Sequence, residues 1–368
     1  MAKGFQIEGN DFDVLFEAPY TNFNTTTFSG VSPTCKYCTR YFGDNPNGGV
    51  HYYAKNGTHY DASPRGFLPS NYKVATISTT GKWMKIQRES TGFSVTVNNS
   101  TTTYRNSNRG SYPINRVGLV FCGGGAGGGG GGAYVEMDGD AGFYANWSAG
   151  NGGGGGATVA VTLWLDKYTY YLYLGAGGSG GGSSTSSSSG GQVGGNGGAS
   201  YLRLTSSSGT LLATANGGKC DQSEAAATIN NSSYTTTVAT AKGGYGGAGG
   251  ACYDMYQSLE YDYGYADDIY QAGSAGSSGT LSGYFSQQVS GARINQSNSG
   301  IDAHYDWTSP DGNSYWMGAG GEGRSAMDTT AGCGGRGGDA GYNQGSWSVD
   351  AYAENGGSGK GGRAFFYY

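Results

Sequence analysis

Hydrophobic and polar residues alternate in three neighbouring segments in the first third of the chain. Residues 82–87 and 92–98 alternate clearly and residues 72–78 alternate in part, with β-branched and aromatic side chains among the apolar positions. A period of two predicts strands with one buried face. Turn-forming Asn-Gly, Thr-Gly and Asn-Asn pairs separate these segments. We therefore predict a small antiparallel β unit over residues 49–116.

The chain from residue 117 onward follows a different pattern, in which short apolar runs alternate with blocks of glycine. The strand-like runs lie at 117–122, 158–165, 168–174 and 201–204, and the chain ends in aromatic residues. The glycine blocks lie at 123–132, 152–156, 175–182, 190–198, 243–250, 318–323, 332–341 and 356–362. We predict a single glycine-rich domain over residues 117–368. Residues 1–48 are too few and too rich in turn residues to bury a core, so they are expected to dock on another surface.

The glycine blocks are expected to form one bundle rather than separate loops. Each glycine loses much backbone entropy on folding, and its buried N–H and C=O groups still need partners. A left-handed extended helix has three residues per turn, a rise of about 3.1 Å and no internal hydrogen bonds. Nearly pure glycine leaves several faces of such a helix bare, so neighbouring helices can hydrogen-bond sideways. Connecting loops would then collect at the two ends, where binding residues are commonly found.

Composition excludes several classes of protein. The chain has 74 glycines and 31 tyrosines among 368 residues, and a formal net charge of -5. Sparse Lys and Arg argue against a nucleic-acid partner. No apolar run approaches about 20 residues, so no membrane insertion is expected. An N-terminal apolar signal core is missing as well, which argues against secretion. Aromatic residues make up 14%, which disfavours a disordered chain.

The order of these segments carries a resemblance. Residues 121–126, the glycine block 152–156, the strand-like run 158–165 and residues 170–178 resemble the glycine-rich domain of bacteriophage tail fibre and adhesin proteins of the polyglycine-II sandwich type. The closing Gly-Gly-Arg and its aromatic residues are similar to the last strand of that domain. Residues 4–16 resemble short head segments of phage fibre proteins.

This resemblance implies both a fold and a role. The implied fold is all-β with a polyglycine-II helical bundle, a small N-terminal attachment segment (1–48) and an antiparallel β unit. The implied protein is a virion component, assembled in the host cytoplasm, that forms a homo-oligomer. Its expected partners are other virion proteins, through the N-terminal segment, and a host surface glycan or outer surface protein. No enzymatic activity, cofactor or metal is expected.

The aromatic residues between 251 and 317 are the best candidates for receptor contact. We interpret this stretch as variable loops, because residues 253–270 show no clean strand period. Tyrosine rings give rigid, amphipathic contact area at low entropy cost, and neighbouring carboxylates could bond sugar hydroxyls. The alternative is that the rings pack against the glycine bundle. The candidate residues are Tyr253, Tyr256, Tyr261, Asp262, Tyr263, Tyr265, Tyr270, Trp307, Tyr315 and Trp316.

Other candidate chemistry has weaker support. Cys35 and Cys38 with His51 and His59 have partly zinc-like spacing, but the histidines are too far apart for a finger. We therefore interpret these cysteines, and the dispersed Cys122, Cys220, Cys252 and Cys333, as thiols. Asp138-Gly139-Asp140 is interpreted as a turn rather than a calcium loop.

Catalytic motifs are equally incomplete. His304 with Asp302 and Asp306 lacks a nucleophile elbow. Paired carboxylates for glycoside hydrolysis could come from Asp254, Glu260, Asp262, Asp267 and Asp268, but the sequence does not pair them. A tail fibre or tip adhesin is thus the leading hypothesis. A head fibre or capsid decoration protein and a cell-surface polysaccharide hydrolase are the alternatives.

Overall fold

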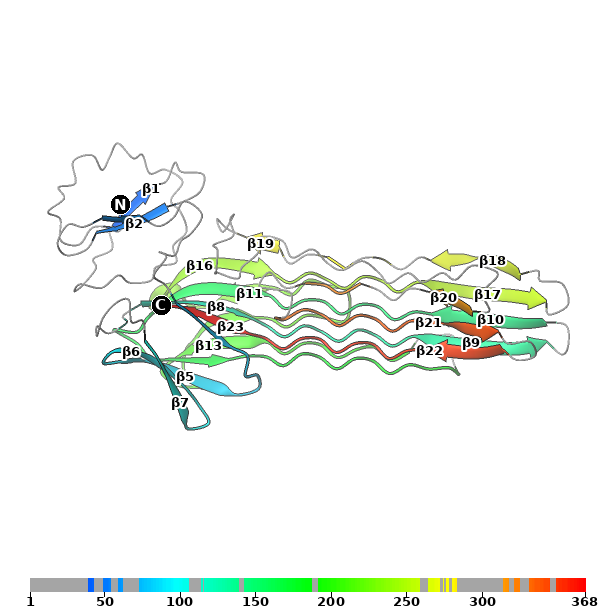
Figure 1. Ribbon diagram of the computed structural model, residues 1–368, viewed down its shortest axis with the longest axis horizontal. Helices are drawn as coiled ribbons and strands as arrows, with labels where there is room; N and C mark the ends of the chain where they lie inside the picture. The colour runs from blue at the N-terminus through cyan, green and yellow to red at the C-terminus, as the bar shows by residue number, and fades with distance from the viewer. Residues whose placement is uncertain are drawn as a thin grey trace.

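The computed structural model shows an elongated molecule with a group of antiparallel sheets at each end (Figure 1). It describes residues 39–42, 49–53, 59–61, 73–105, 114, 116–138, 142–186, 191–258, 264–271, 274, 276–277, 280–282, 314–317, 321–324, 331–344 and 349–368. Across these residues the chain is all-β, as predicted, and its one helical element is the 3-10 turn η3 (Ser232–Tyr234). No helix in this part is long and apolar enough to cross a membrane.

One end, here called the basal end, is built from two large sheets. The six-stranded sheet has the order β19-β16-β11-β8-β23-β4, with bounds Thr280–Ser282, Thr235–Lys242, Thr158–Trp164, Arg116–Cys122, Ala364–Tyr367 and Val74–Ile77. The seven-stranded sheet has the order β15-β14-β13-β12-β5-β6-β7, with bounds Ala227–Ile229, Leu211–Ala215, Ser200–Leu204, Tyr170–Tyr173, Trp83–Glu89, Gly92–Val97 and Ser100–Tyr104.

The opposite end, here called the distal end, carries two smaller sheets. The four-stranded sheet has the order β18-β17-β10-β9, with bounds Gly264–Gln271, Ala251–Ser258, Gly142–Ser148 and Gly132–Asp138. The three-stranded sheet joins β20 (Ser314–Met317), β21 (Ala340–Gln344) and β22 (Val349–Ala353). A further three-stranded sheet is formed early in the chain by β1 (Thr39–Phe42), β2 (Gly49–Tyr53) and β3 (His59–Asp61).

The main hydrophobic core lies between the two basal sheets. Alternation along β5 buries Met84 and Ile86, and the same period along β12 buries Tyr170 and Leu172. They share one cluster with Phe121 and other apolar side chains of the six-stranded sheet. The strands predicted from alternation and from apolar runs are confirmed as β4, β5, β6, β8, β11, β12 and β13, and the closing strand implied by the resemblance is β23.

Both basal sheets combine strands from before and after residue 117. Strand β5 pairs with β12, and β4 pairs with the C-terminal strand β23. The expected boundary at residues 116–117 therefore falls at the start of β8, and strands on either side of it share both sheets. Burial of one apolar face of β5 and β6 needs the facing sheet, which only the later residues supply.

Part of the region expected to be aromatic loops is strand instead. Residues 251–258 and 264–271 form β17 and β18, which pair with each other, while β17 also pairs with β10. The loop interpretation is wrong for these residues. Ala145 of β10 pairs with Met255 and Trp147 pairs with Cys252, so β17 has an extra residue there, which breaks its period of two. An irregularity of this kind adds a residue on one strand and hides a simple alternation.

Extended glycine-rich segments join the two ends side by side, and Figure 1 shows them running the length of the molecule. Residues 123–131, here called the central segment, connect β8 to β9. Their successive N–H groups donate to three neighbouring segments in rotation. Gly124, Gly127 and Gly130 donate to the carbonyl groups of residues 198, 195 and 192. Gly125, Gly128 and Gly131 donate to the carbonyl groups of residues 360, 357 and 354. Ala126 and Gly129 donate to the carbonyl groups of residues 154 and 151, and all these N···O distances are 2.8–3.0 Å.

The central segment also accepts hydrogen bonds from its surroundings. The carbonyl groups of Gly125 and Gly128 accept from Gly178 and Gly181, and those of Ala126 and Gly129 accept from Gly335 and Gly338. The backbone of this buried segment is therefore paired in several directions, as buried N–H and C=O groups require.

Close approach of the backbones explains why side chains are missing from the central segment. A Cβ on Gly124, Gly127 or Gly130 would lie 1.9–2.2 Å from a carbonyl oxygen of residues 176–182. A Cβ on Gly125, Gly128 or Gly131 would lie equally close to a carbonyl oxygen of residues 333–339. At Gly129 the nearest atom would be 3.5 Å away. Only every third position can thus carry a side chain, and Ala126 occupies the one before Gly129.

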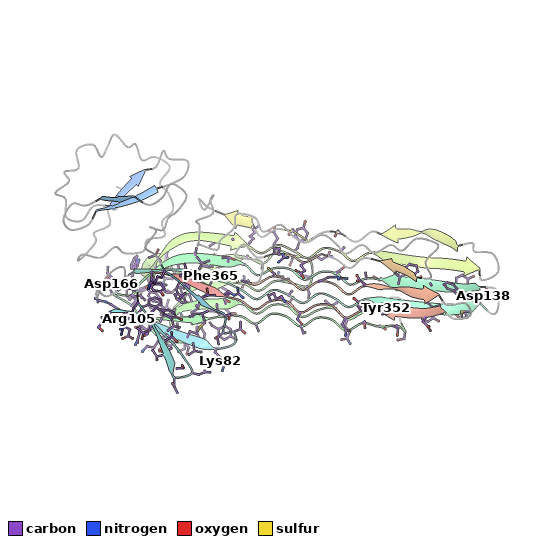
Figure 2. The ribbon with its side chains drawn as sticks, in the orientation of Figure 1. Lys82, Arg105, Asp138, Asp166, Tyr352 and Phe365 are labelled. Carbon is purple, nitrogen blue, oxygen red and sulfur yellow. The ribbon has the colours of Figure 1, made fainter. Side chains whose placement is uncertain are left out.

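Side chains are correspondingly scarce along the middle of the molecule and dense at the basal end (Figure 2). The labelled residues Lys82, Arg105, Asp166 and Phe365 lie at the basal end, and Asp138 and Tyr352 lie at the distal end. The glycine-rich middle therefore offers few groups for recognition, and the basal end offers many.

Candidate functional site

The two distal sheets pack against each other through small and aromatic side chains. Phe143, Ala145 and Trp147 of β10 are buried in one cluster with Ala340 of β21. Val135 of β9 and Ala351 and Ala353 of β22 are partly buried against it. Because side chains alternate along a strand, the intervening residues of each sheet belong to its outer face.

The outer face of the four-stranded sheet presents exposed tyrosines. Tyr144 of β10 is 46% exposed and Tyr134 of β9 is 37% exposed. Tyr144 lies directly opposite Glu136, and Tyr134 lies opposite Asn146, so the two rings occupy diagonal positions. The Tyr134 hydroxyl donates to Glu136 Oε2 at 3.3 Å. The surface thus combines aromatic area, hydroxyl donors and a carboxylate acceptor.

Sheet register extends this surface across two further strands. Tyr256 of β17 lies opposite Tyr144, and Tyr265 of β18 lies opposite Tyr256. Directly paired residues occupy the same face of a sheet. The positions of Tyr265, Tyr256, Tyr144 and Glu136 therefore form one row on the outer face, which we call the distal row.

The three-stranded sheet places two more aromatic residues in one row. Trp316 of β20 and Tyr352 of β22 both lie opposite Gly341 of β21, which has no side chain. The Tyr352 hydroxyl donates to Glu354 Oε1 at 2.7 Å. This hydrogen bond to a carboxylate raises the pKa of Tyr352 above its usual value of 10.0. The phenol is therefore held in its neutral, hydrogen-bonding form.

The distal strands carry charge of one sign. None of their residues is Lys or Arg, whereas acidic residues occur on both sheets. The acidic residues are Glu136, Asp138, Asp254, Asp267, Asp268 and Asp350. This distribution disfavours anionic ligands at the distal end and suits ligands rich in hydroxyl groups.

Six of the ten predicted site residues lie on distal strands, and they do not all lie in the same cross-strand row. Tyr256, Tyr265 and Trp316 occupy the two outer rows. Tyr270 lies in the same cross-strand row as the buried Trp147. Tyr315 lies two positions from Met317, which pairs with the buried Ala340. Both positions therefore belong to the inner faces of their sheets. Tyr253 lies opposite Ile269 at the register shift. The remaining candidates, Tyr261, Asp262, Tyr263 and Trp307, lie outside the described residues.

Sequence reasoning missed Tyr134, Tyr144 and Tyr352. All three lie beside glycine blocks in segments that we did not interpret as strands. The signal was present along residues 142–148, where buried Phe143, Ala145 and Trp147 alternate with partly exposed residues. Tyr144 occupies an outward position of that pattern.

The other candidate chemistry is only partly covered. His51 and His59 belong to β2 and β3, Asp254 to β17, and Asp267 and Asp268 to β18, while Asp138 ends β9. Cys35, Cys38, Gly139, Asp140, Glu260, Asp302, His304 and Asp306 lie outside the described residues. Among the residues that are described, no three His, Cys, Asp or Glu side chains come together as a metal site would require.

The distal surface lies far from the point where the described chain resumes after the early sheet. The Lys73 N–H donates to the Tyr368 carbonyl group at 2.9 Å, and the Tyr368 N–H donates to the Lys73 carbonyl group at 3.1 Å. Both residues belong to the basal end, where Figure 1 places the C-terminus. The glycine-rich segments separate this point from the aromatic surface. No protein-family model matches the chain, and no curated protein sequence matches it.

Proposed function

We propose that the protein is a bacteriophage virion component, a tail fibre or tip adhesin, whose distal aromatic surface binds a receptor on the host cell. The receptor is a surface glycan or an outer surface protein, and residues 1–48 attach the chain to other virion proteins. The chain functions as a homo-oligomer, because fibres are built from symmetric assemblies. The proposal is supported by the segment order that resembles phage adhesins.

The observation that carries this proposal is the position of the aromatic surface. Exposed Tyr134 and Tyr144 lie on the distal sheets, whereas Lys73 and Tyr368 lie together at the basal end. An attachment segment that precedes Lys73 in the chain would hold the basal end and present the distal rings outward. Exposed aromatic residues with nearby polar groups are enriched at recognition surfaces.

We also propose that the glycine-rich segments are polyglycine-II helices. The rotation of hydrogen-bond partners along residues 124–131 repeats every three residues, as a helix with three residues per turn requires. The close contacts that an added Cβ would make at Gly125, Gly128 and Gly131 have the same repeat. Such a bundle would act as a rigid spacer between the attachment and binding ends.

The receptor role is tested by binding of the full chain to cells of the bacterium that propagates the phage. Tyr134→Ala with Tyr144→Ala is expected to weaken cell binding by at least tenfold, since both rings are exposed on the outer face of the four-stranded sheet. Tyr245→Ala is the matched control, because Tyr245 is 43% exposed but lies in a glycine-rich segment between the ends. Equal loss in both variants, or no loss in either, would contradict the proposed site.

Two outcomes would favour the alternative functions. Gold-labelled antibody against the chain is expected at the tail tip of purified virions, and label on the head would identify a head fibre or decoration protein. Release of reducing sugar from host polysaccharide by the purified chain would instead indicate a hydrolase.

A further inference from the structure

The outer face of the seven-stranded basal sheet carries a second aromatic surface, separate from the distal row. It consists of two cross-strand rows on β5, β12 and β13, which we call the basal array. Its members are Trp83, Tyr173 and Tyr201 in the first row, and Lys85, Tyr171 and Arg203 in the second. All six side chains are partly exposed, while their strand neighbours Met84, Leu172 and Leu202 are fully buried. The array therefore faces away from the core.

The first row is a continuous strip of three rings. The ring centroids of Trp83 and Tyr173 are 5.4 Å apart, and those of Tyr173 and Tyr201 are 6.1 Å apart. The planes are inclined by 48° and 37°. These separations are typical of interacting aromatic pairs. Contact between the rings limits their rotation, so the strip is preorganised before any ligand arrives.

The second row adds cations at both sides of Tyr171. The Arg203 guanidinium carbon lies 5.9 Å from the centroid of the Trp83 ring, and Nη1 donates to the Gly209 carbonyl group at 2.8 Å. These contacts hold the guanidinium group across the array. Arg203 Nε is buried without a hydrogen-bond partner. Lys85 lies at the opposite side of the row.

The one carboxylate of β5 on the same face already has hydrogen-bond partners. Glu89 of β5 accepts hydrogen bonds from Ser94 Oγ at 2.6 Å and from Gln87 Nε2 at 3.0 Å. The Ser94 bond is the main reason why the pKa of Glu89 lies below its usual value. Elsewhere this face carries hydroxyl groups, such as Thr96 and Thr101, whose oxygens lie 2.8 Å apart. Positive charge thus predominates at the array.

We propose that the basal array binds an anionic saccharide chain. Sugar rings stack on Trp83, Tyr173 and Tyr201, and a carboxylate or sulfate group of the chain pairs with Lys85 and Arg203. The presence of cations distinguishes this surface from the distal strands, which have none. Two cations are few for a nucleic acid, whose binding depends on many phosphate contacts. The proposal is independent of the distal receptor surface.

The test measures binding of three probes to the full chain by isothermal titration. The probes are hexagalacturonate, which carries carboxylates, neutral cellohexaose and single-stranded oligothymidylate of similar length. Hexagalacturonate is expected to bind at least tenfold more tightly than either of the others. Preference for oligothymidylate would assign the array to nucleic acid instead, and equal binding of the two saccharides would remove the role of the cations.

Variants locate the binding on the array. Lys85→Glu and Tyr173→Ala are each expected to weaken hexagalacturonate binding by at least tenfold. Arg88→Glu is the matched control, because Arg88 is an exposed cation on the same strand that pairs with buried Phe93 and not with the array. Unchanged affinity in Lys85→Glu and Tyr173→Ala, or an equal loss in Arg88→Glu, would overturn the proposal. Circular dichroism establishes that each variant is folded.

Discussion

A single methyl group added to the central segment tests the steric pattern of the bundle. The Cβ of Gly128→Ala would lie 2.0 Å from the Arg336 carbonyl oxygen and 2.4 Å from its carbon. Contacts below 3.0 Å are essentially never seen for a real Cβ. The central segment must therefore move away from residues 333–339 by about an ångström, in a region where side chains cannot absorb the shift.

The expected cost follows from overpacking and from lost hydrogen bonds. Overpacking in a well-packed core costs about 1–3 kcal/mol. Gly128 donates to Gly357 at 2.9 Å and accepts from Gly181 at 2.8 Å, and each buried group left unpaired adds about 1–3 kcal/mol. With one of these two bonds lost, Gly128→Ala is expected to lower the free energy of unfolding by about 2–6 kcal/mol. At roughly 2 °C per kcal/mol in a domain of this size, Tm falls by about 4–12 °C.

Gly129→Ala is the matched control, one residue away in the same buried segment. Its Cβ would lie 3.5 Å from the nearest atom, the Asn151 nitrogen, and its backbone has no positive φ. The substitution restricts the unfolded chain and is expected to stabilise the fold by up to about 1 kcal/mol. Differential scanning calorimetry of both variants checks the pair. A neutral Gly128→Ala, or an equal loss at both positions, would refute the three-residue steric pattern.

Two further predictions concern the basal end. The Ser200 hydroxyl accepts a hydrogen bond from the Gly175 N–H at 2.9 Å and donates one to the Cys122 carbonyl group at 2.7 Å, and both bonds are buried. Ser200→Ala is therefore expected to lower the free energy of unfolding in urea by about 2–3 kcal/mol. A change below about 0.5 kcal/mol would contradict this. Burial raises the pKa of Tyr104 and of Tyr368 above 10.0. The contribution of these two phenols to stability is thus fully present below pH about 10 and is lost as pH rises through their folded-state pKa values. Replacing both residues by Phe should reduce this loss of stability, which is measured by unfolding between pH 8 and 11.

The basal strands were the part of the fold that the sequence predicted well. Alternation in residues 82–87 reports one buried face, and β5 has one, whereas residues 92–95 of β6 are buried on both faces. The apolar run 158–165 became β11, buried along nearly all its length. Partner strands could not be predicted, because β4 pairs with β23, nearly three hundred residues later. Pairing at such separation depends on the whole sandwich and leaves no local pattern.

The distal site was harder to predict for two physical reasons. Strands β9 and β10 follow or precede nearly pure glycine, so their short alternation is easily read as part of a glycine block. Strand β17 has an extra residue between Cys252 and Met255 in its pairing with β10, which interrupts its period. Tyrosine composition drew attention to residues 251–317 and away from Tyr134, Tyr144 and Tyr352. Which tyrosines share a face became apparent only from register, as in the row of Tyr144, Tyr256 and Tyr265.

The rotation of hydrogen-bond partners along the central segment has a mechanical consequence. A pull applied between the two ends acts along the glycine-rich segments, and their hydrogen bonds lie across that direction. The bonds from residues 124–131 to three neighbours are then sheared together and cannot open one at a time from an end. Rupture requires many bonds to fail in a single event, so unfolding under load is governed by a high kinetic barrier. The bundle resists tension along its axis far better than peeling of one segment from its surface.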